Sequence, residues 1–162
     1  MAGYEFYFKF DATKQGKSKG TSPRGPWKDW APALHIDYEV TAPYDISSGH
    51  ASGKRIHKPI TITKAWDANT PLLFNALTTN EVLKTVEFNF VLPNKEGKEE
   101  VYFTIKLTDA VVAAQKLYMS GSGQRMMRED VHDLEDVSFT FRKIEVESKL
   151  AKTMATDDWF AG

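Results

Sequence analysis

The segment Ser48–Lys64, S-G-H-A-S-G-K-R-I-H-K-P-I-T-I-T-K, joins a glycine-serine loop to a basic cluster and then to an alternating strand. Gly49 and Gly53 enclose a part of the loop with few apolar side chains, so nothing there can anchor it in a core and it should protrude. Pro59 cannot donate to a strand ladder and therefore marks an edge or the start of a strand. Isoleucine and threonine then alternate over residues 60–63, which predicts a half-buried strand.

A short helix is predicted directly after this strand. Asn69 or Thr70 can cap it, and Pro71 suits the first helical position because its φ is fixed near the helical value. The predicted buried face consists of residues at helical spacing: Leu72, Leu73, Ala76 and Leu77.

Elsewhere the apolar period is two, which is typical of strands with one buried face. A Pro93–Gly97 turn predicts a hairpin between residues 86–92 and 101–107. Apolar residues at 137–141 and at 144–146 are out of step by one position, which predicts a bulge near Arg142 and Lys143. Further strands are predicted at Tyr4–Phe10, with an aromatic inner face, and at Leu34–Val40, with Leu34, Ile36, Tyr38 and Val40 on one side.

Short strands at hairpin spacing with a single helix predict an all-β fold, an antiparallel β-barrel or sandwich of two sheets with one short flanking α-helix. The expected domain covers residues 1–147. Residues 148–162 show no strand period and are predicted to be a C-terminal tail.

Composition excludes several classes of protein. The 162 residues carry a net charge of -1, from 21 basic and 22 acidic side chains, so a strongly basic nucleic-acid binder is not expected. Cysteine is absent, which removes disulfides and thiolate metal sites. The first ten residues alternate like a strand, so we expect no cleavable signal peptide, and no apolar run reaches the roughly 18 residues of a membrane span.

Catalytic motifs are weak. Gly49 and Gly53 followed by Lys54 lack the spacing of a phosphate loop and the Ser or Thr that should follow its lysine. The four histidines have no metal-ligand spacing. We therefore expect no enzyme, no cofactor and no metal.

The Ser48–Lys64 stretch, together with the D-x-x-x-P-L-L pattern of residues 67–73, resembles the Hcp family, the tube-forming hemolysin-coregulated proteins of type VI secretion systems. Residues 30–40 and 107–112 are similar to further strands of that family, so the resemblance covers Tyr4 to about Glu147. It implies a β-barrel that assembles as a hexameric ring, rings that stack into an expelled inner tube, and effector proteins carried in the channel. It also implies a bacterial cytoplasmic protein that is later secreted, with spike and sheath proteins as partners and no nucleic acid or membrane insertion.

The resemblance and the loop chemistry suggest two groups of site residues. The basic cluster could pair with a carboxylate of a neighbouring subunit, although a solvated hairpin loop remains the alternative. The residues expected to make subunit and ring contacts are Ser48, Gly49, His50, Ser52, Gly53, Lys54, Arg55, His57 and Lys58. Those expected to line the channel and bind effectors are His35, Asp37 and Glu39, and the resemblance places Asp37 at the position that governs cargo binding.

Two other functions stay open. A monomeric β-barrel that binds a small apolar ligand would need a dry pocket lined by the aromatic residues. A carbohydrate-active jelly-roll enzyme would need two carboxylates beside a groove. Exposure of Trp27 and Trp30 would favour the enzyme, whereas their burial would count against it.

Overall fold

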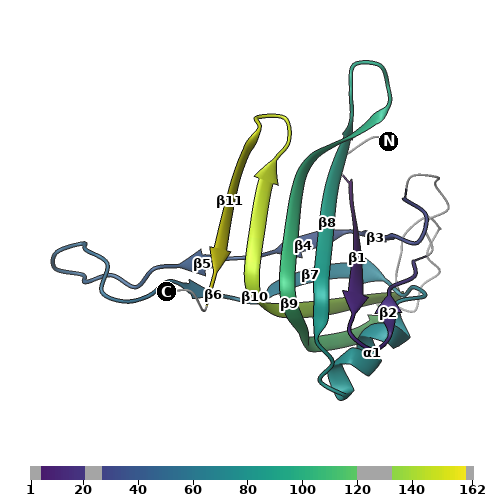
Figure 1. The fold of residues 1–162 in the computed structure, drawn as a ribbon, viewed down its shortest axis with the longest axis horizontal. Helices are drawn as coiled ribbons and strands as arrows, with labels where there is room; N and C mark the ends of the chain where they lie inside the picture. The colour runs from purple at the N-terminus through teal and green to yellow at the C-terminus, as the bar shows by residue number, and fades with distance from the viewer. Residues whose placement is uncertain (1–4, 21–26, 120–132, 160–162) are drawn as a thin grey trace.

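Strand β1 (Glu5–Ala12) is where the main sheet closes on itself, because it pairs along its length with β8 (Leu83–Pro93) and also with β3 (Ala31–Ala33). This computed structural model describes residues 5–20, 27–119 and 133–159 (Figure 1). The remaining strands are β2 (Gly16–Lys17), β4 (His35–Asp37), β5 (Val40–Thr41), β6 (Ile56–His57), β7 (Ile60–Ala65), β9 (Glu99–Met119), β10 (Asp133–Ser148) and β11 (Thr153–Asp158).

The nine-stranded sheet is antiparallel and follows the order β2-β1-β8-β9-β10-β7-β4, with β3 also paired to β1 and β11 also paired to β10. Only Leu34 separates β4 from β3, and its N–H donates to the carbonyl of Thr63 at 2.8 Å. Because β4 pairs with β7 and β3 pairs with β1, these two short strands join the β7 end of the sheet to β1. The predicted antiparallel all-β fold with one helix is confirmed, and the sheet forms a closed barrel.

Aromatic side chains fill the barrel. Phe8, Phe88 and Phe139 are fully buried, with ring centroids 6.0–6.3 Å apart. Each ring that leaves water contributes about 2–3 kcal/mol of hydrophobic free energy. Because side chains occupy the interior, the barrel is a packed core and not a ligand cavity, which counts against the apolar-ligand alternative.

Helix α1 (Thr70–Thr78) lies at one end of the barrel (Figure 1). Leu73 and Ala76 are buried and Leu72 and Leu77 pack against the core, as predicted. Asn69 occupies the N-cap position, but its side chain makes no capping hydrogen bond.

The 86–92 and 101–107 hairpin is confirmed as β8 and β9, but the bulge is not where the sequence predicted it. The register shift between β9 and β10 lies between Ser138 and Phe139. The buried face of β10 does change at Arg142 and Lys143, opposite Asp109, whose φ is +53°. The switch of the apolar residues from one side of β10 to the other therefore coincides with the unusual backbone conformation of Asp109 on β9.

Residues after Ser148 were predicted to lack a strand, and this is wrong for Thr153–Asp158. They form β11, which pairs with β10 from Lys143 to Ser148. The side chains of β11 are mostly exposed, so the strand is held by main-chain pairing and has no apolar alternation for a sequence pattern to detect.

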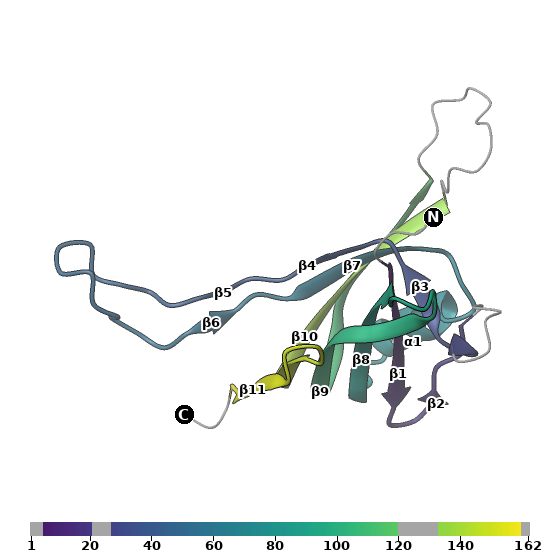
Figure 2. The ribbon, with the colours of Figure 1, turned by 90° about the horizontal axis from the view of Figure 1, so that it is seen from above.

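Strands β5 and β6 form a two-stranded sheet with no partner among the other described strands, and they extend β4 and β7 away from the barrel (Figure 2). We call residues 40–57 the arm. Its end is closed by a bridge between Tyr44 and Ala51 and by a hydrogen bond from the Asp45 N–H to the His50 carbonyl. The predicted protruding loop is this arm.

Candidate assembly surface: the arm, its base and a polar face

The tip of the arm is ordered by its own polar groups. The Asp45 carboxylate accepts hydrogen bonds from Ser47 and Ser48, and these bonds lower the pKa of Asp45, the backbone N–H of Ser47 contributing most. Gly49 has φ +76°, a conformation that favours glycine. The predicted contact residues at this tip, Ser48, Gly49, His50, Ser52 and Gly53, are all exposed.

Apolar side chains also project from the arm. Tyr44 is 64% exposed and Ile46 is 89% exposed, while Val40 and Ile56 on the two arm strands are half exposed. A segment this narrow has no core in which to bury them. The arm therefore offers apolar surface to another molecule.

His57, at the base of the arm, is only 6% exposed. Its Nδ1 lies 2.6 Å from the Tyr38 hydroxyl and its Nε2 lies 2.6 Å from Asp157 Oδ2. The imidazole stacks on Tyr38 and meets Phe141 and Trp159 edge to face. The partners of His57 within the chain thus account for this residue without a direct contact to another subunit.

Arg55 also finds its partner within the chain. Its Nε and Nη2 each donate to Asp157 at 2.9 Å, and Nη2 donates to the Asp158 carbonyl at 2.9 Å. The Arg55 guanidinium, followed by His57, holds the pKa of Asp157 below its usual value. The sequence suggested a carboxylate from a neighbouring molecule for this cluster, whereas the structure supplies one from β11.

The other two cations of the cluster lie at the surface. Lys58 Nζ is 3.3 Å from Glu39 Oε1, with both side chains more than half exposed, and such a pair adds little stability. Lys54 is exposed on the arm. Of the four predicted basic contact residues, Lys54 and Lys58 are therefore the ones placed to meet another molecule.

The predicted channel residues share one polar face. His35, Asp37 and Glu39 are all exposed along β4 and the chain after it. Pairing places His35 opposite Thr63 and Asp37 opposite Thr61, so these side chains lie on the same side of the sheet.

Polar contacts continue across this face onto β10. Thr61 Oγ1 is 2.8 Å from Ser138 Oγ, and Thr63 donates to Asp136 at 2.8 Å. Tyr118 on β9 donates to the same Asp136 carboxylate at 3.2 Å. We call the side of β4, β7, β10 and β9 that carries these residues the polar face.

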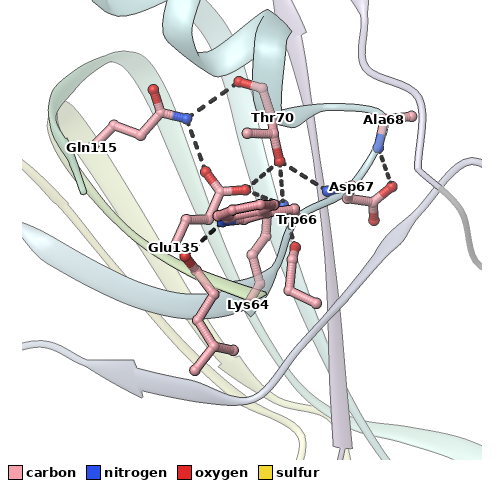
Figure 3. Close-up of polar contacts among 9 residues, drawn as sticks. Lys64, Trp66, Asp67, Ala68, Thr70, Gln115 and Glu135 are labelled. Atoms are coloured by element: carbon pink, nitrogen blue, oxygen red, sulfur yellow. Dashed lines mark hydrogen bonds and ion pairs between the residues drawn. The ribbon is translucent and has the colours of Figure 1, made fainter. Parts of the chain in front are cut away.

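Sequence reasoning missed a buried ion pair. Lys64 and Glu135 are both fully buried, and Lys64 Nζ lies 2.6 Å from Glu135 Oε2 (Figure 3). Gln115 donates to the other Glu135 oxygen at 2.8 Å, and the Thr70 hydroxyl also donates to Glu135. Burial lowers the pKa of Lys64, and the Glu135 carboxylate opposes that shift.

A signal for this pair was present in the sequence. Lys64 is in phase with the buried Ile60 and Ile62, and Glu135 is in phase with the buried Val137 and Phe139. Two charges of opposite sign at core-phase positions near strand ends indicate a buried pair, since an isolated buried charge is too costly.

Known proteins give a consistent comparison. The family model described as "Type VI secretion system effector, Hcp" matches residues 7–147. The "Major exported protein" of Pseudomonas aeruginosa is 35% identical over 162 residues, a match that covers 94% of this chain and 94% of that protein. This chain belongs to the Hcp family.

Solved Hcp structures agree with the family assignment. A structure described as "Crystal structure of Hcp protein" has a TM-score of 0.90 at 34% identity and covers 99% of this chain and 100% of its own. A secreted Hcp protein from Pseudomonas aeruginosa has a TM-score of 0.79 at 30% identity, with 98% of this chain and 100% of that chain covered.

The described residues of this Hcp chain do not support the carbohydrate-enzyme alternative. Trp27 is buried, stacks on Tyr7 with centroids 4.7 Å apart and donates to Glu99 at 3.1 Å. Trp30 is partly buried against Trp27, with the Lys9 ammonium over its ring. Both rings are therefore used in packing and do not form a sugar-stacking platform.

Within residues 5–20, 27–119 and 133–159, no cluster of three potential metal ligands occurs. The same part of the chain contains no helix long and apolar enough to cross a membrane.

Proposed function

We propose that this chain is the tube subunit of a type VI secretion system and acts by binding, without catalysis or a cofactor. Six copies close a ring, rings stack into the inner tube, and the tube is expelled with effector proteins in its channel. Membership of the Hcp family and likeness to a relative named as an exported protein support this proposal. In this scheme the protein is made in the bacterial cytoplasm and meets spike and sheath proteins there.

The arm is the observation that carries the assembly proposal. It projects from the barrel, exposes Tyr44 and Ile46, and has no core of its own (Figure 2). An arm on one subunit that meets a different surface on the next makes a heterologous contact. Such contacts close a ring or, where they do not close, generate a filament.

Strand β11 offers a second contact. Among the described strands it pairs only with β10, so its other edge presents main-chain groups, apart from the Asp158 carbonyl that Arg55 binds. Edges of this kind are suited to pairing with another chain. In a ring, such pairing hides an edge that would otherwise promote aggregation.

The polar face suits a water-filled channel between subunits. The barrel itself is packed, so any lumen must be built from outer surfaces of several copies. Asp37 and its neighbours on β7 and β10 supply carboxylates and hydroxyls that can hydrogen-bond a passing protein. Effector proteins would then be held by polar contacts at this face.

Light scattering coupled to size exclusion, with negative-stain imaging, tests the proposal. We expect a mass near six times 18.3 kDa and annular particles. Ile46→Asp should reduce the hexamer fraction, whereas Phe74→Asp, which alters a 57% exposed side chain on α1, should not. A wild-type chain that stays monomeric at every concentration would contradict the assembly.

A further inference from the structure

Only a few connections link the arm to the barrel. Strands β5 and β6 belong to a separate two-stranded sheet, joined to the nine-stranded sheet by the chain passing to β4 and to β7. Side-chain contacts at the base add Arg55 and His57 on one side and Asp157 on the other. These contacts join β6 to β11, 100 and more residues later in the chain.

The position of Asp157 is set by the barrel. Strand β11 is in register with β10, with Asp157 opposite Ile144, and Trp159 N–H donates to the Arg142 carbonyl at 2.8 Å. The Trp159 ring then packs against His57 at a centroid distance of 5.1 Å. Strand β11 ends beside the base of the arm (Figure 1), where Asp157 bonds both Arg55 and His57.

We infer that β11 is a clamp for the arm and that Asp157 is the residue that positions it. A planar guanidinium bonded twice to one carboxylate restricts angle as well as distance. The second contact of this carboxylate comes from His57 in β6, two residues after Arg55, and it opposes a rotation of the arm about the Arg55 contact alone. The clamp therefore sets the direction in which the arm points.

A fixed arm direction should make assembly easier, an expectation that rests on the proposed function. A contact segment already held in its docking orientation loses less conformational freedom when it binds. The Asp157 contact should therefore favour assembly through the direction of the arm, separately from any pairing of the β11 edge with a neighbouring subunit. The clamp itself can be tested on single chains, without ring assembly.

Spin labels can measure the arm direction, because the chain has no native cysteine. Labels at Ser48→Cys on the arm and Lys84→Cys on β8 report the distance between arm tip and barrel by double electron–electron resonance. Labelled chains are diluted with unlabelled ones, so that only distances within one chain are seen. We expect one narrow distribution, which Asp157→Asn shifts or broadens.

Asp109→Asn is the control. It breaks an Arg–Asp pair with the same 2.9 Å Nε–Oδ2 distance, between Arg142 and Asp109, and leaves in place both the ion pair of Arg142 with Asp158 on β11 and the Asp157 contacts of the arm. The control should leave the distribution as in wild type. An unchanged distribution in Asp157→Asn would overturn the clamp.

Hydrogen exchange gives an independent readout. The arm-base amides, such as the Lys58 N–H bonded to the Glu39 carbonyl, should exchange roughly tenfold faster in Asp157→Asn, while the β8–β9 hairpin is unaffected. If that variant does not fold, Arg55→Gln removes the same contact from the other side. Where both single variants fold, the effect of the double variant should be smaller than the sum of the two single effects, because both remove the Arg55–Asp157 contact.

The outcomes separate the clamp from the tube proposal. A mobile arm in Asp157→Asn, with a wild-type chain that never forms rings, would support the clamp and contradict the assembly. A fixed arm in Asp157→Asn, with impaired ring formation, would overturn the clamp and leave the assembly proposal intact.

Discussion

Lys64 Nζ lies 2.6 Å from Glu135 Oε2 inside a barrel end where neither side chain reaches solvent. The pair connects β7 to β10, and the hydroxyl of Thr70 joins it to the first turn of α1 (Figure 3). The contact thus ties the helix to the sheet at the point where the Ser48–Lys64 segment ends.

Removing one partner should be strongly destabilising. Lys64→Met leaves the Glu135 carboxylate buried without a counter-charge, and we expect a loss of about 3–5 kcal/mol in the free energy of unfolding by urea denaturation. Lys84→Met, which alters an exposed lysine on β8, should change it by less than about 0.5 kcal/mol. A Lys64→Met chain as stable as wild type would show that Glu135 does not depend on this partner.

At acid pH, the free energy of unfolding should depend on the ionisation of Asp157. Its folded-state pKa is lowered, mainly by Arg55 and then by His57, so its contribution is fully present above the unfolded carboxyl pKa. That contribution is lost as the pH falls through the lowered folded-state pKa. Urea midpoints measured between neutral and acid pH should fall less steeply for Asp157→Asn than for wild type. Parallel profiles would mean that the pairing does not stabilise the fold.

Charge reversal at Lys54 should weaken assembly at low salt. This side chain is exposed on the arm, unlike Arg55, so Lys54→Glu changes a contact between molecules without breaking one inside the chain. The defect should shrink as salt rises, because the screening length falls from about 10 Å at 0.1 M to about 3 Å at 1 M. Sedimentation velocity gives the assembled fraction, with Lys84→Glu as control. A defect of equal size at both salt concentrations would argue against a charge contact.

Asp37 should influence which proteins the channel holds. Asp37→Lys reverses a charge on the polar face without altering the barrel core, so ring size should persist while retention of basic cargo falls. Co-purified proteins identified by mass spectrometry provide the measurement. Glu96→Lys, in the exposed β8–β9 turn, is the matched control. Identical cargo in all three proteins would exclude Asp37 from cargo selection.

Local patterns account for much of the fold. The glycine loop, Pro59 and the alternating isoleucines predicted the protruding segment followed by β7, and Pro71 with its apolar neighbours predicted α1. Alternation was less reliable near the arm. Leu34 is 59% exposed and Val40 is 48% exposed, although both were expected to share a side with Ile36. Strand β4 spans only His35–Asp37, so Leu34 and Val40 lie beyond its two ends and are less well covered than Ile36.

Contacts between distant segments were outside the reach of such patterns. The strand at Tyr4–Phe10 was predicted to have one aromatic inner face, yet Tyr7, which points to the opposite side from Phe6 and Phe8, is also buried, under Trp27. The predicted tail contains Asp157, the partner of Arg55 about a hundred residues earlier. In both cases the partner, Trp27 or Asp157, comes from a distant part of the chain. The alternation of apolar and polar residues within one strand does not indicate which distant segment will pack against it. Tyr4, at the start of the first predicted strand, and the end of the predicted tail after Trp159 lie outside the described residues.

The sequence by itself determined the antiparallel β class, the single helix, the position of the protruding loop and the family, because each follows from side-chain periodicity or from residues close together in the chain. Tertiary structure alone decided how the barrel closes, through β4 and β3 onto β1, that Lys64 meets Glu135, and that Asp157 on β11 contacts the base of the arm. Those outcomes depend on register and packing between strands far apart in sequence. The free energy of such a contact depends on both partners together, so the local sequence around one of them does not predict it.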